Sequence, residues 1–275
     1  MIFTCPICNG KLNKLDKAYV CANGHSYDIA AEGYVHLLPP NKMHSKVPGD
    51  NKLMVASRRN FLEAGFYRLF SDKLNELIRE YLHTKNPIIL DAGCGEGYYT
   101  GRLYDDLTAH GVSPQVYGFD ISKFAVKAAA KNYKTIDFAV GSIFSIPVED
   151  AAADCVLDVF APIVESELNR VLKPGGFLIL AVPGERHLYG LKEILYDSPY
   201  ENEYKETQYA GFEFVSRVPV QDDIQLDSNQ IIMDLFAMTP YYWKTTIEGS
   251  ERLKQTNCLS TQIEFDFLIY RKISP

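Results

Sequence analysis

The sequence has few cysteines and lacks the segments that direct a chain out of the cytosol. Its first residues show no basic region followed by an apolar stretch and a small-residue cleavage site, so we expect no signal peptide. No apolar run reaches the roughly 18 residues that a membrane-spanning helix needs. We therefore expect a cytoplasmic protein without a membrane partner, in a compartment where its six cysteines stay reduced.

The composition is that of a globular protein, but the charge is unevenly spread. With 275 residues, of which 47% are hydrophobic and 23% charged, the chain is long enough for one large domain and a small module. The net charge is −7, yet residues 1–60 contain eight Lys or Arg and four Asp or Glu, a net +4. Such a basic N-terminal part would meet a polyanionic partner, although a solvated lysine-rich loop explains the same charge.

Three of the six cysteines lie together near the N-terminus, beside a histidine. Cys5 and Cys8 are spaced as C-x-x-C, and Cys21 and His25 follow as C-x-x-x-H. Each pair can sit on a tight turn, and two such turns supply the four tetrahedral ligands of a zinc ion. Because so short a segment has too little apolar surface for a core, a bound metal would stabilise its fold. The spacing favours a structural zinc site over a disulfide, which a reducing compartment disfavours, and over unrelated free thiols.

The rest of the chain alternates between apolar runs and helical periodicity. Residues 39–52 are rich in Pro, Gly, Lys and Asn and indicate a basic linker, and residues 53–83 have a helical pattern that Gly65 divides. Beyond residue 87, strands alternate with helices, which predicts an α/β fold with a parallel sheet covered on both faces. The predicted strands cover 88–92, 116–120, 136–140, 154–160 and 177–182, with helices near 98–109, 122–132 and 163–172, a turn at 173–176, and weaker strands near 212–218 and 261–270.

A glycine-rich loop follows the first predicted strand, in the stretch DAGCGEGYYT. Gly93, Gly95 and Gly97 let the backbone approach a ligand closely, just before a helix N-terminus. Counted from Asp91, the spacing is D-x-G-x-G-x-G and not the G-x-G-x-x-G of enzymes that bind nicotinamide dinucleotides. A dinucleotide-binding enzyme is therefore the weaker alternative interpretation of this loop. The next strand ends in Asp120, an acid suited to binding the two ribose hydroxyls of a nucleoside. Loop and acid together resemble the class I S-adenosylmethionine (SAM)-dependent methyltransferases, in which the loop holds the methionine part of SAM.

Several further stretches, taken with these two motifs, resemble one family. They are 32-EGYVHLLP-39, 48-PGD-50, 58-RRNFLEAGFY-67, 183-PGERHLYGLK-192 and 238-MTPYYW-243. With its cysteine pairs and its glycine loop, the chain resembles the 23S ribosomal RNA guanine-N1 methyltransferases, a family that includes macrolide-resistance members. The match runs strongly to about residue 192 and more thinly beyond it.

The resemblance implies a Rossmann-like class I methyltransferase sheet behind a small zinc ribbon. The ribbon would occupy residues 1–37, a basic linker 38–60 and the methyltransferase domain 61–275. The family pattern implies a structural zinc ion held by Cys5, Cys8, Cys21 and His25. It implies SAM contacts from Tyr67, from Gly95, Glu96, Gly97 and Tyr98 of the loop, and from His187. It also implies a homodimer whose zinc modules clamp a hairpin of 23S rRNA, which agrees with the basic N-terminal part.

The expected reaction is direct transfer of the SAM methyl group to N1 of a guanine in that hairpin. Guanine N1 carries a proton, and the sequence identifies no base that removes it, although Asp158 is a candidate by its location. Phe160 is a candidate for stacking on an RNA base or, equally, for core packing. Two alternatives stay open, namely a SAM methyltransferase acting on a small molecule and a zinc-ribbon RNA-binding factor without catalysis.

Overall fold

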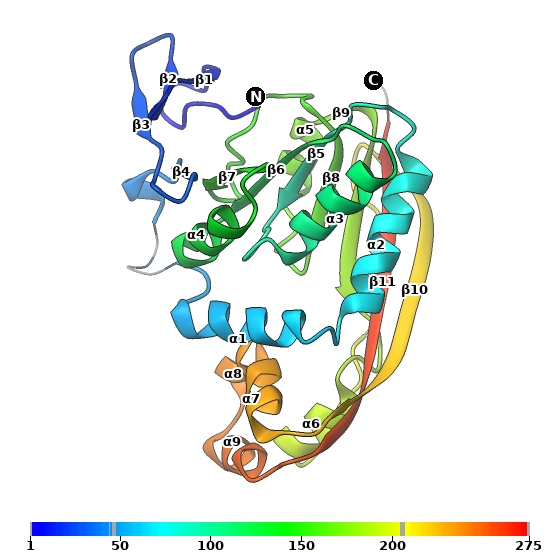
Figure 1. Ribbon diagram of the computed structural model, residues 1–275. Coiled ribbons are helices and arrows are strands. Elements are labelled where there is room, and N and C mark those ends of the chain that lie inside the picture. The colour runs from blue at the N-terminus through cyan, green and yellow to red at the C-terminus, as the bar shows by residue number, and fades with distance from the viewer. Residues whose placement is uncertain (1, 44, 46–47, 204–206, 274–275) are drawn as a thin grey trace.

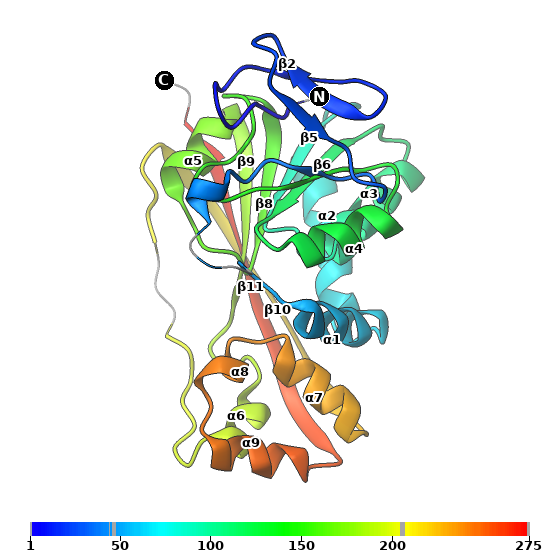
Figure 2. The same cartoon turned by 90° about the vertical axis from the view of Figure 1, so that its left-hand side faces the viewer.

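The computed structural model describes residues 2–43, 45, 48–203 and 207–273, and it has three parts (Figure 1). A small N-terminal ribbon lies at one end of a large sheet, and a group of helices lies at the far end of a long hairpin of that sheet (Figures 1 and 2). His44, Lys46 and Val47 of the predicted linker lie outside the described residues. None of the described helices combines the length and the apolar character that crossing a membrane requires.

The ribbon consists of β1 (Leu12–Lys14), β2 (Ala18–Cys21) and β3 (Ser26–Asp28), paired antiparallel in that order. It is too small to enclose a core of its own, so its apolar side chains pack on the large sheet. Phe3 is fully buried there, and its ring meets that of Tyr117 edge-on at 5.5 Å. The backbone N–H of Thr4 donates to Pro147 O at 2.9 Å. Because residues 141–152 contain no helix, the ribbon itself covers this part of the sheet.

Two of the N-terminal lysines pair with acids of the large sheet and its loops. Lys14 Nζ lies 2.6 Å from Asp137 Oδ1, and Lys11 Nζ lies 3.4 Å from Glu149 Oε2. Exposed pairs of this kind contribute little to stability. They do, however, neutralise part of the positive charge on which the predicted contact with a polyanion rests.

The large sheet has the strand order β10-β11-β9-β8-β5-β6-β7-β4. Strands β4 to β9 run parallel, whereas β11 and β10 are antiparallel additions at one edge. The predicted alternation of strands and helices is therefore confirmed. At residues 173–176, where the sequence predicted a turn, β9 continues through an irregularity in its pairing with β8. The strands are β4 (Val35–His36), β5 (Ile88–Ala92), β6 (Gln115–Asp120), β7 (Asp137–Val140), β8 (Ala153–Val159), β9 (Leu172–Pro183), β10 (Phe212–Leu226) and β11 (Leu259–Lys272).

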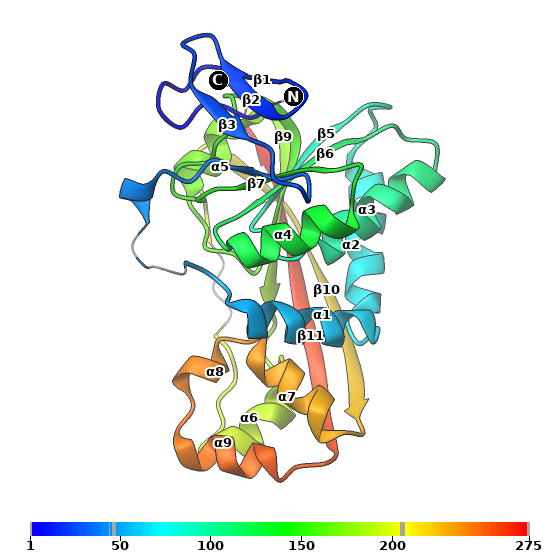
Figure 3. The ribbon, with the colours of Figure 1, turned by 60° about the vertical axis from the view of Figure 1, so that its left-hand side comes forward.

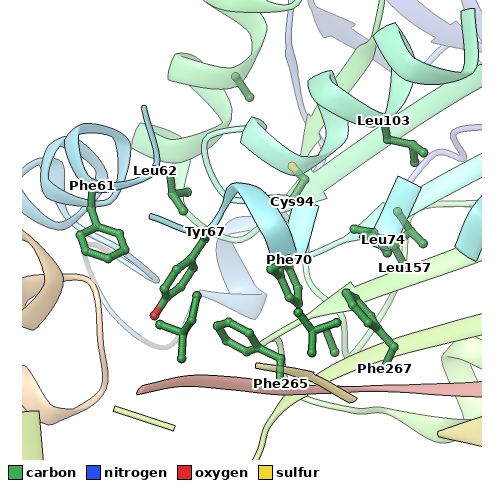
Figure 4. Packing of buried hydrophobic residues seen from close by; sticks show 14 of the residues in the cluster. Phe61, Leu62, Tyr67, Phe70, Leu74, Cys94, Leu103, Leu157, Phe265 and Phe267 are labelled. Atoms are coloured by element: carbon green, nitrogen blue, oxygen red, sulfur yellow. The ribbon is translucent and has the colours of Figure 1, made fainter. Parts of the chain in front are cut away.

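The helices of the sheet follow the predicted pattern closely. Gly65, with φ of 90°, separates α1 (Lys52–Glu63) from α2 (Arg68–Tyr81), as predicted. The next three are α3 (Tyr98–Ala109), α4 (Lys123–Asn132) and α5 (Glu165–Val171), each within two residues of its predicted bounds. Figure 4 shows Phe70 of α2 against Phe265 and Phe267 of β11, with ring centroids 4.6 and 4.7 Å away.

Some structured elements fall inside the predicted ribbon and linker ranges. Strand β4 lies within the range predicted for the ribbon, yet it pairs with β7 of the large sheet. The short helix η1 (Pro40–Lys42) and most of α1 lie within the range predicted for the linker. Asn51 caps α1, since its side chain accepts a hydrogen bond from Met54 N at 3.1 Å. The chain from β4 onward is therefore continuous with the large sheet.

The C-terminal helices form a lobe at the end of the β10–β11 hairpin (Figures 2 and 3). Both predicted strands are confirmed, but they are longer than predicted and carry the lobe beyond the sheet. A buried carboxylate stiffens the hairpin, because Arg217 donates to both oxygens of Asp266 at 2.8 Å. Helix α7 packs against α1, which places the lobe opposite the glycine-rich loop. The lobe contains α6 (Tyr189–Leu195), α7 (Asn229–Ala237), α8 (Tyr241–Lys244) and α9 (Ile247–Lys254).

Candidate functional site

The glycine-rich loop leaves the carboxyl end of β5 and starts helix α3. Gly93 has φ of 86°, and a Cβ at this position would lie 2.6 Å from the Ala161 Cβ, so the site accepts only glycine. The backbone N–H groups of Gly93 and Cys94 both donate to Phe119 O, at 2.9 and 3.0 Å, which fixes the loop to β6. The loop is thus held as a concave turn at the edge of the sheet where parallel α/β folds bind ligands.

The loop forms one wall of a cavity of about 360 Å³, called here the first cavity. A volume of this size suits a small-molecule ligand. Gly97 does not line it, and a Cβ there would lie 3.0 Å from the Ala129 Cβ, so this glycine lets α4 approach the loop. The structure brings together six of the predicted cofactor-binding residues on the wall: Asp91, Gly93, Gly95, Glu96, Tyr98 and Asp120.

Asp91 presents a buried carboxylate with unused hydrogen-bonding capacity. Thr100 Oγ1 donates to its Oδ2 at 2.5 Å, whereas its Oδ1 has no hydrogen-bond partner in the described part of the chain. Burial raises the pKa of Asp91 to about 7, against the opposing effect of the Thr100 hydrogen bond. An unpaired buried acceptor is costly, so the wall is complementary to a ligand that brings a cationic donor such as an ammonium group.

Asp120 and Glu96 complete the acidic lining of the first cavity. Asp120 accepts from Ser122 N at 2.7 Å and from Gly95 N at 3.1 Å, which orients its carboxylate and leaves lone pairs for a ligand hydroxyl. Burial raises the pKa of Asp120, and these two backbone donors oppose the shift. Burial also raises the pKa of Glu96 to about 7, with Arg59 and Arg58 lowering it in part. This set of acceptors fits the ammonium and ribose groups of SAM.

A second cavity, of about 810 Å³, adjoins the first and reaches into the C-terminal lobe. Arg58 and Phe160 line both cavities, so the two share a wall. Tyr67 and His187, which were predicted to contact SAM, line the second cavity and not the first. Figure 4 shows the buried Tyr67 ring next to Phe265, and the two ring centroids are 5.0 Å apart.

His187 is held as a neutral hydrogen-bond donor. Its Nδ1 accepts from the backbone N–H of Glu264 at 3.2 Å, which leaves the proton on Nε2. Burial lowers the pKa of His187 to about 3, and the nearby Lys192 ammonium lowers it further. The imidazole therefore stays uncharged at neutral pH and can donate from Nε2 to an oxygen of a ligand.

Asp158 lies on the wall of the second cavity at the end of β8. Its Oδ1 accepts from Ala161 N at 3.0 Å, and its Oδ2 has no partner among the described residues. Burial raises the pKa of Asp158 to about 8. Phe160 follows it with φ of 61°, a strained value for a residue with a ring, and this kind of strain is concentrated at functional sites.

Sequence reasoning missed Arg58, which lines both cavities, and Trp243, which lines the second. Arg58 pairs with Asp50 and donates through Nη2 to Met238 O at 3.1 Å, linking α1 to the C-terminal lobe. Trp243, from α8, lines the second cavity and is 66% exposed. These residues stood within the stretches that carry the family resemblance, but no local spacing indicates that segments 180 residues apart meet here.

The four predicted zinc ligands converge in the ribbon. Their donor atoms all lie within 4.8 Å of one another. Cys5 Sγ and Cys21 Sγ lie 3.5 and 3.4 Å from His25 Nδ1, and Cys8 Sγ lies 3.7 Å from Cys21 Sγ. A tetrahedral zinc site with Zn–S near 2.3 Å and Zn–N near 2.0 Å has edges of roughly 3.5 to 3.8 Å. The Tyr27 hydroxyl, 3.1 Å from Cys5 Sγ, supplies the outer hydrogen bond typical of such a ligand.

Comparison with known proteins matches both parts of the chain. Residues 3–46 match the zinc-ribbon family described as "RlmA, N-terminal", and residues 83–238 match the family described as "Methyltransferase domain". A Streptomyces fradiae protein named 23S rRNA (guanine(748)-N(1))-methyltransferase is 31% identical over 246 residues, which cover 87% of this chain and 85% of that protein. YxjB of Bacillus subtilis (strain 168), provisionally named a 23S rRNA (guanine-N(1)-)-methyltransferase, is 30% identical over 285 residues, covering 98% and 97%. The crystal structure of a Bacillus halodurans C-125 protein, provisionally titled a methyltransferase, superposes on this chain with a TM-score of 0.51 and 18% sequence identity. The superposition covers 74% of this chain and 100% of the Bacillus halodurans chain, which shows that the two share a fold.

Proposed function

The chain belongs to the 23S rRNA (guanine-N1)-methyltransferase family, and we propose that it transfers a methyl group from SAM to N1 of a guanine in 23S rRNA. The relatives named for this activity match it over most of their own length, and the match to YxjB covers 98% of this chain. When bound, SAM supplies a methyl group activated by the adjacent sulfonium. The protein's own contribution is to position the donor and the guanine next to each other.

One observation carries this proposal, namely two adjoining cavities at the carboxyl edge of the sheet. Asp91 and Asp120 place acceptors in the first cavity, where the ammonium and ribose groups of SAM would bind. The second cavity has room for the guanine, and Phe160 lies on the wall that the two share. Tyr67 and His187 line the second cavity and not the first, so their contact with SAM stays a prediction.

Removal of the guanine N1 proton needs an acceptor near the shared wall. The unpaired Oδ2 of Asp158 is the candidate, and burial raises the pKa of this carboxyl to about 8. A carboxyl with such a pKa takes up a proton near neutral pH more readily than an exposed one. Its role as the base stays a prediction.

The mode of RNA binding also belongs to the proposal. A hairpin of 23S rRNA is the expected substrate, bound by a homodimer in the cytoplasm, with the zinc ribbons at the RNA. Since Lys11 and Lys14 are paired with acids, phosphate groups would have to compete with Glu149 and Asp137 for them. Because lysines that neutralise phosphates release counterions from the RNA, binding should weaken as salt rises.

The test is methyl transfer from labelled SAM to 23S rRNA from a strain that lacks the protein, with the modified nucleotide mapped by mass spectrometry. Incorporation at one guanine, as 1-methylguanosine, supports the proposal, and Asp91→Asn should reduce it strongly when SAM is limiting. SAM binding without transfer to rRNA would favour the non-catalytic RNA-binding alternative. Transfer to a small molecule, with no salt-dependent RNA binding, would favour the other alternative.

A further inference from the structure

Lys192 of α6 is a fully buried lysine outside both cavities. Its Nζ donates to the backbone carbonyl oxygen of Tyr200 at 2.9 Å and to Asn202 Oδ1 at 2.8 Å. The same ammonium lies 4.5 Å from the centroid of the Tyr200 ring and 5.9 Å from that of Tyr241. Burial lowers the pKa of Lys192, so these contacts compensate for the loss of water around a charge.

The groups that Lys192 holds are all part of one wall of the second cavity. Tyr200, Asn202 and Tyr241 line it, and they come from the segment after α6 and from α8. Asn202 also donates from Nδ2 to Gly184 O at 2.7 Å, which attaches this segment to the end of β9. A single buried cation thus contacts three pieces of chain, namely α6, the segment that follows it and α8.

Phe160, which lines both cavities, presents an aromatic platform in the second one. The Phe160 ring stacks on Phe70 at 5.6 Å with an interplanar angle of 26°, yet the residue remains 46% exposed. One face of the ring is therefore packed while part of the side chain stays open. Trp243 and Tyr200, 66% and 50% exposed, stand on the lobe side of the same cavity. Aromatic faces of this kind bind unstacked nucleic acid bases.

We propose that the second cavity receives the target guanine after it leaves the RNA stack, between Phe160 and the aromatic wall that Lys192 holds in place. This inference rests on the proposed function and assigns the nucleotide to a site. Lys192 is a positioning residue, since it acts through Tyr200, Asn202 and Tyr241 and does not line the cavity. Enzymes that act on a base commonly extrude it into such a pocket, because its reactive edge is otherwise inaccessible.

Trp243 gives a direct readout, because it is the only tryptophan of the chain and lines the second cavity. The probe is the 23S rRNA fragment that the wild-type protein methylates, titrated with S-adenosylhomocysteine present. A guanine that enters the cavity stacks near the indole and should quench its emission. Unchanged Trp243 emission at saturating RNA would overturn the assignment.

The variant Lys192→Met keeps the apolar stem and removes the charge. We expect KM for the RNA fragment to rise about tenfold or more, because hydrogen bonds from a charged donor are lost, while SAM affinity stays within about twofold. The matched control is Lys272→Met, since Lys272 Nζ also donates to two backbone carbonyls, those of Asn169 and Leu172, away from both cavities. Equal effects of the two substitutions on RNA affinity would overturn the positioning role.

A second variant keeps the inference testable if Lys192→Met fails to fold. Tyr200→Ala truncates a half-exposed side chain, so the protein should fold, bind SAM normally and lose Trp243 quenching by RNA. Normal KM and normal quenching in Tyr200→Ala would refute the cavity assignment while leaving wild-type methylation intact. Failure of the wild-type protein to methylate rRNA would instead refute the proposed function itself.

Discussion

Replacing Cys8 by serine removes one of the four ligands expected to hold zinc, and its effect should reach the opposite end of the molecule. The ribbon has no core of its own and lies on the large sheet. Phe3 and Leu12 are fully buried there, and Tyr19 is 1% exposed. Loss of the metal would therefore expose these side chains together with the sheet surface beneath them.

The size of the effect follows from this burial. Returning three such side chains to water costs about 1.5 to 3 kcal/mol each, or roughly 5 to 9 kcal/mol together. A folded domain is stable by only about 5 to 15 kcal/mol, so most of the stability of the sheet is at stake. One kcal/mol shifts Tm by about 2 to 4 °C in a domain of 150 to 250 residues, so we expect Tm to fall by at least about 10 °C.

The assay is thermal unfolding followed by the fluorescence of Trp243, which lies in α8 at the far end from the ribbon (Figure 1). Zinc content is measured on the same samples, and removal of zinc from the wild type with a chelator should reproduce the shift. Cys258→Ser is the control, because that thiol is exposed and lies outside the ribbon. The reasoning is refuted if Cys8→Ser loses its zinc while its Trp243 transition stays within about 2 °C of the wild type, because the ribbon would then fold independently.

Three further predictions follow from buried charges. Asp91→Asn keeps the shape of the side chain but removes the carboxylate that faces the first cavity. Calorimetry should show that this variant binds SAM at least about tenfold more weakly than the wild type. The control Asp150→Asn changes a surface residue and should bind SAM with normal affinity. Burial raises the pKa values of Asp91 and Glu96 to about 7 and that of Asp158 to about 8, so the folded protein holds protons that the unfolded chain releases near pH 4. His187, whose pKa burial lowers to about 3, opposes this effect in part, because the unfolded chain binds its proton below about pH 6.5. The three carboxyls outweigh the one histidine, so the free energy of unfolding should fall as pH rises from about 4 to 7, and a Tm that rises over this range would contradict the prediction. Arg217→Ala leaves the buried Asp266 carboxylate without its bidentate partner and should cost about 3 kcal/mol in urea unfolding, and an unchanged midpoint would show that the pair is not stabilising.

The elements predicted from the sequence are those whose signal is local. Strand β5 and helix α3 have the bounds that their apolar periodicity predicted, and the glycines between them mark the loop. The long hairpin and its lobe were predicted only in part. Strand β10 is mostly exposed, because it lies at the edge of the sheet, and the few side chains that it buries, such as Val220 and Ile224, make only a weak apolar pattern.

The cavity walls depended on contacts that no local pattern contains. Arg58 meets Met238 across 180 residues, and Lys192 joins Tyr200 to Tyr241 of α8. The family resemblance drew attention to Tyr67 and His187, but only the packing of the lobe against α1 shows that they line the larger cavity. The position of the ribbon also depended on such contacts. The spacing of its cysteines and histidine predicts a metal site but does not indicate that the ribbon packs on the large sheet.

The sequence by itself determined the clustered cysteines and histidine of the ribbon and the glycine loop with its acids, because each set depends on short stretches whose backbone chemistry admits few conformations. Only the tertiary structure decided that the ribbon serves as a cover for the sheet and that two cavities share Arg58 and Phe160. Which distant segments meet depends on how the faces of the helices and the sheet bury their apolar surface. The packing of lowest free energy depends on the contacts of the complete chain and not on those of any one segment.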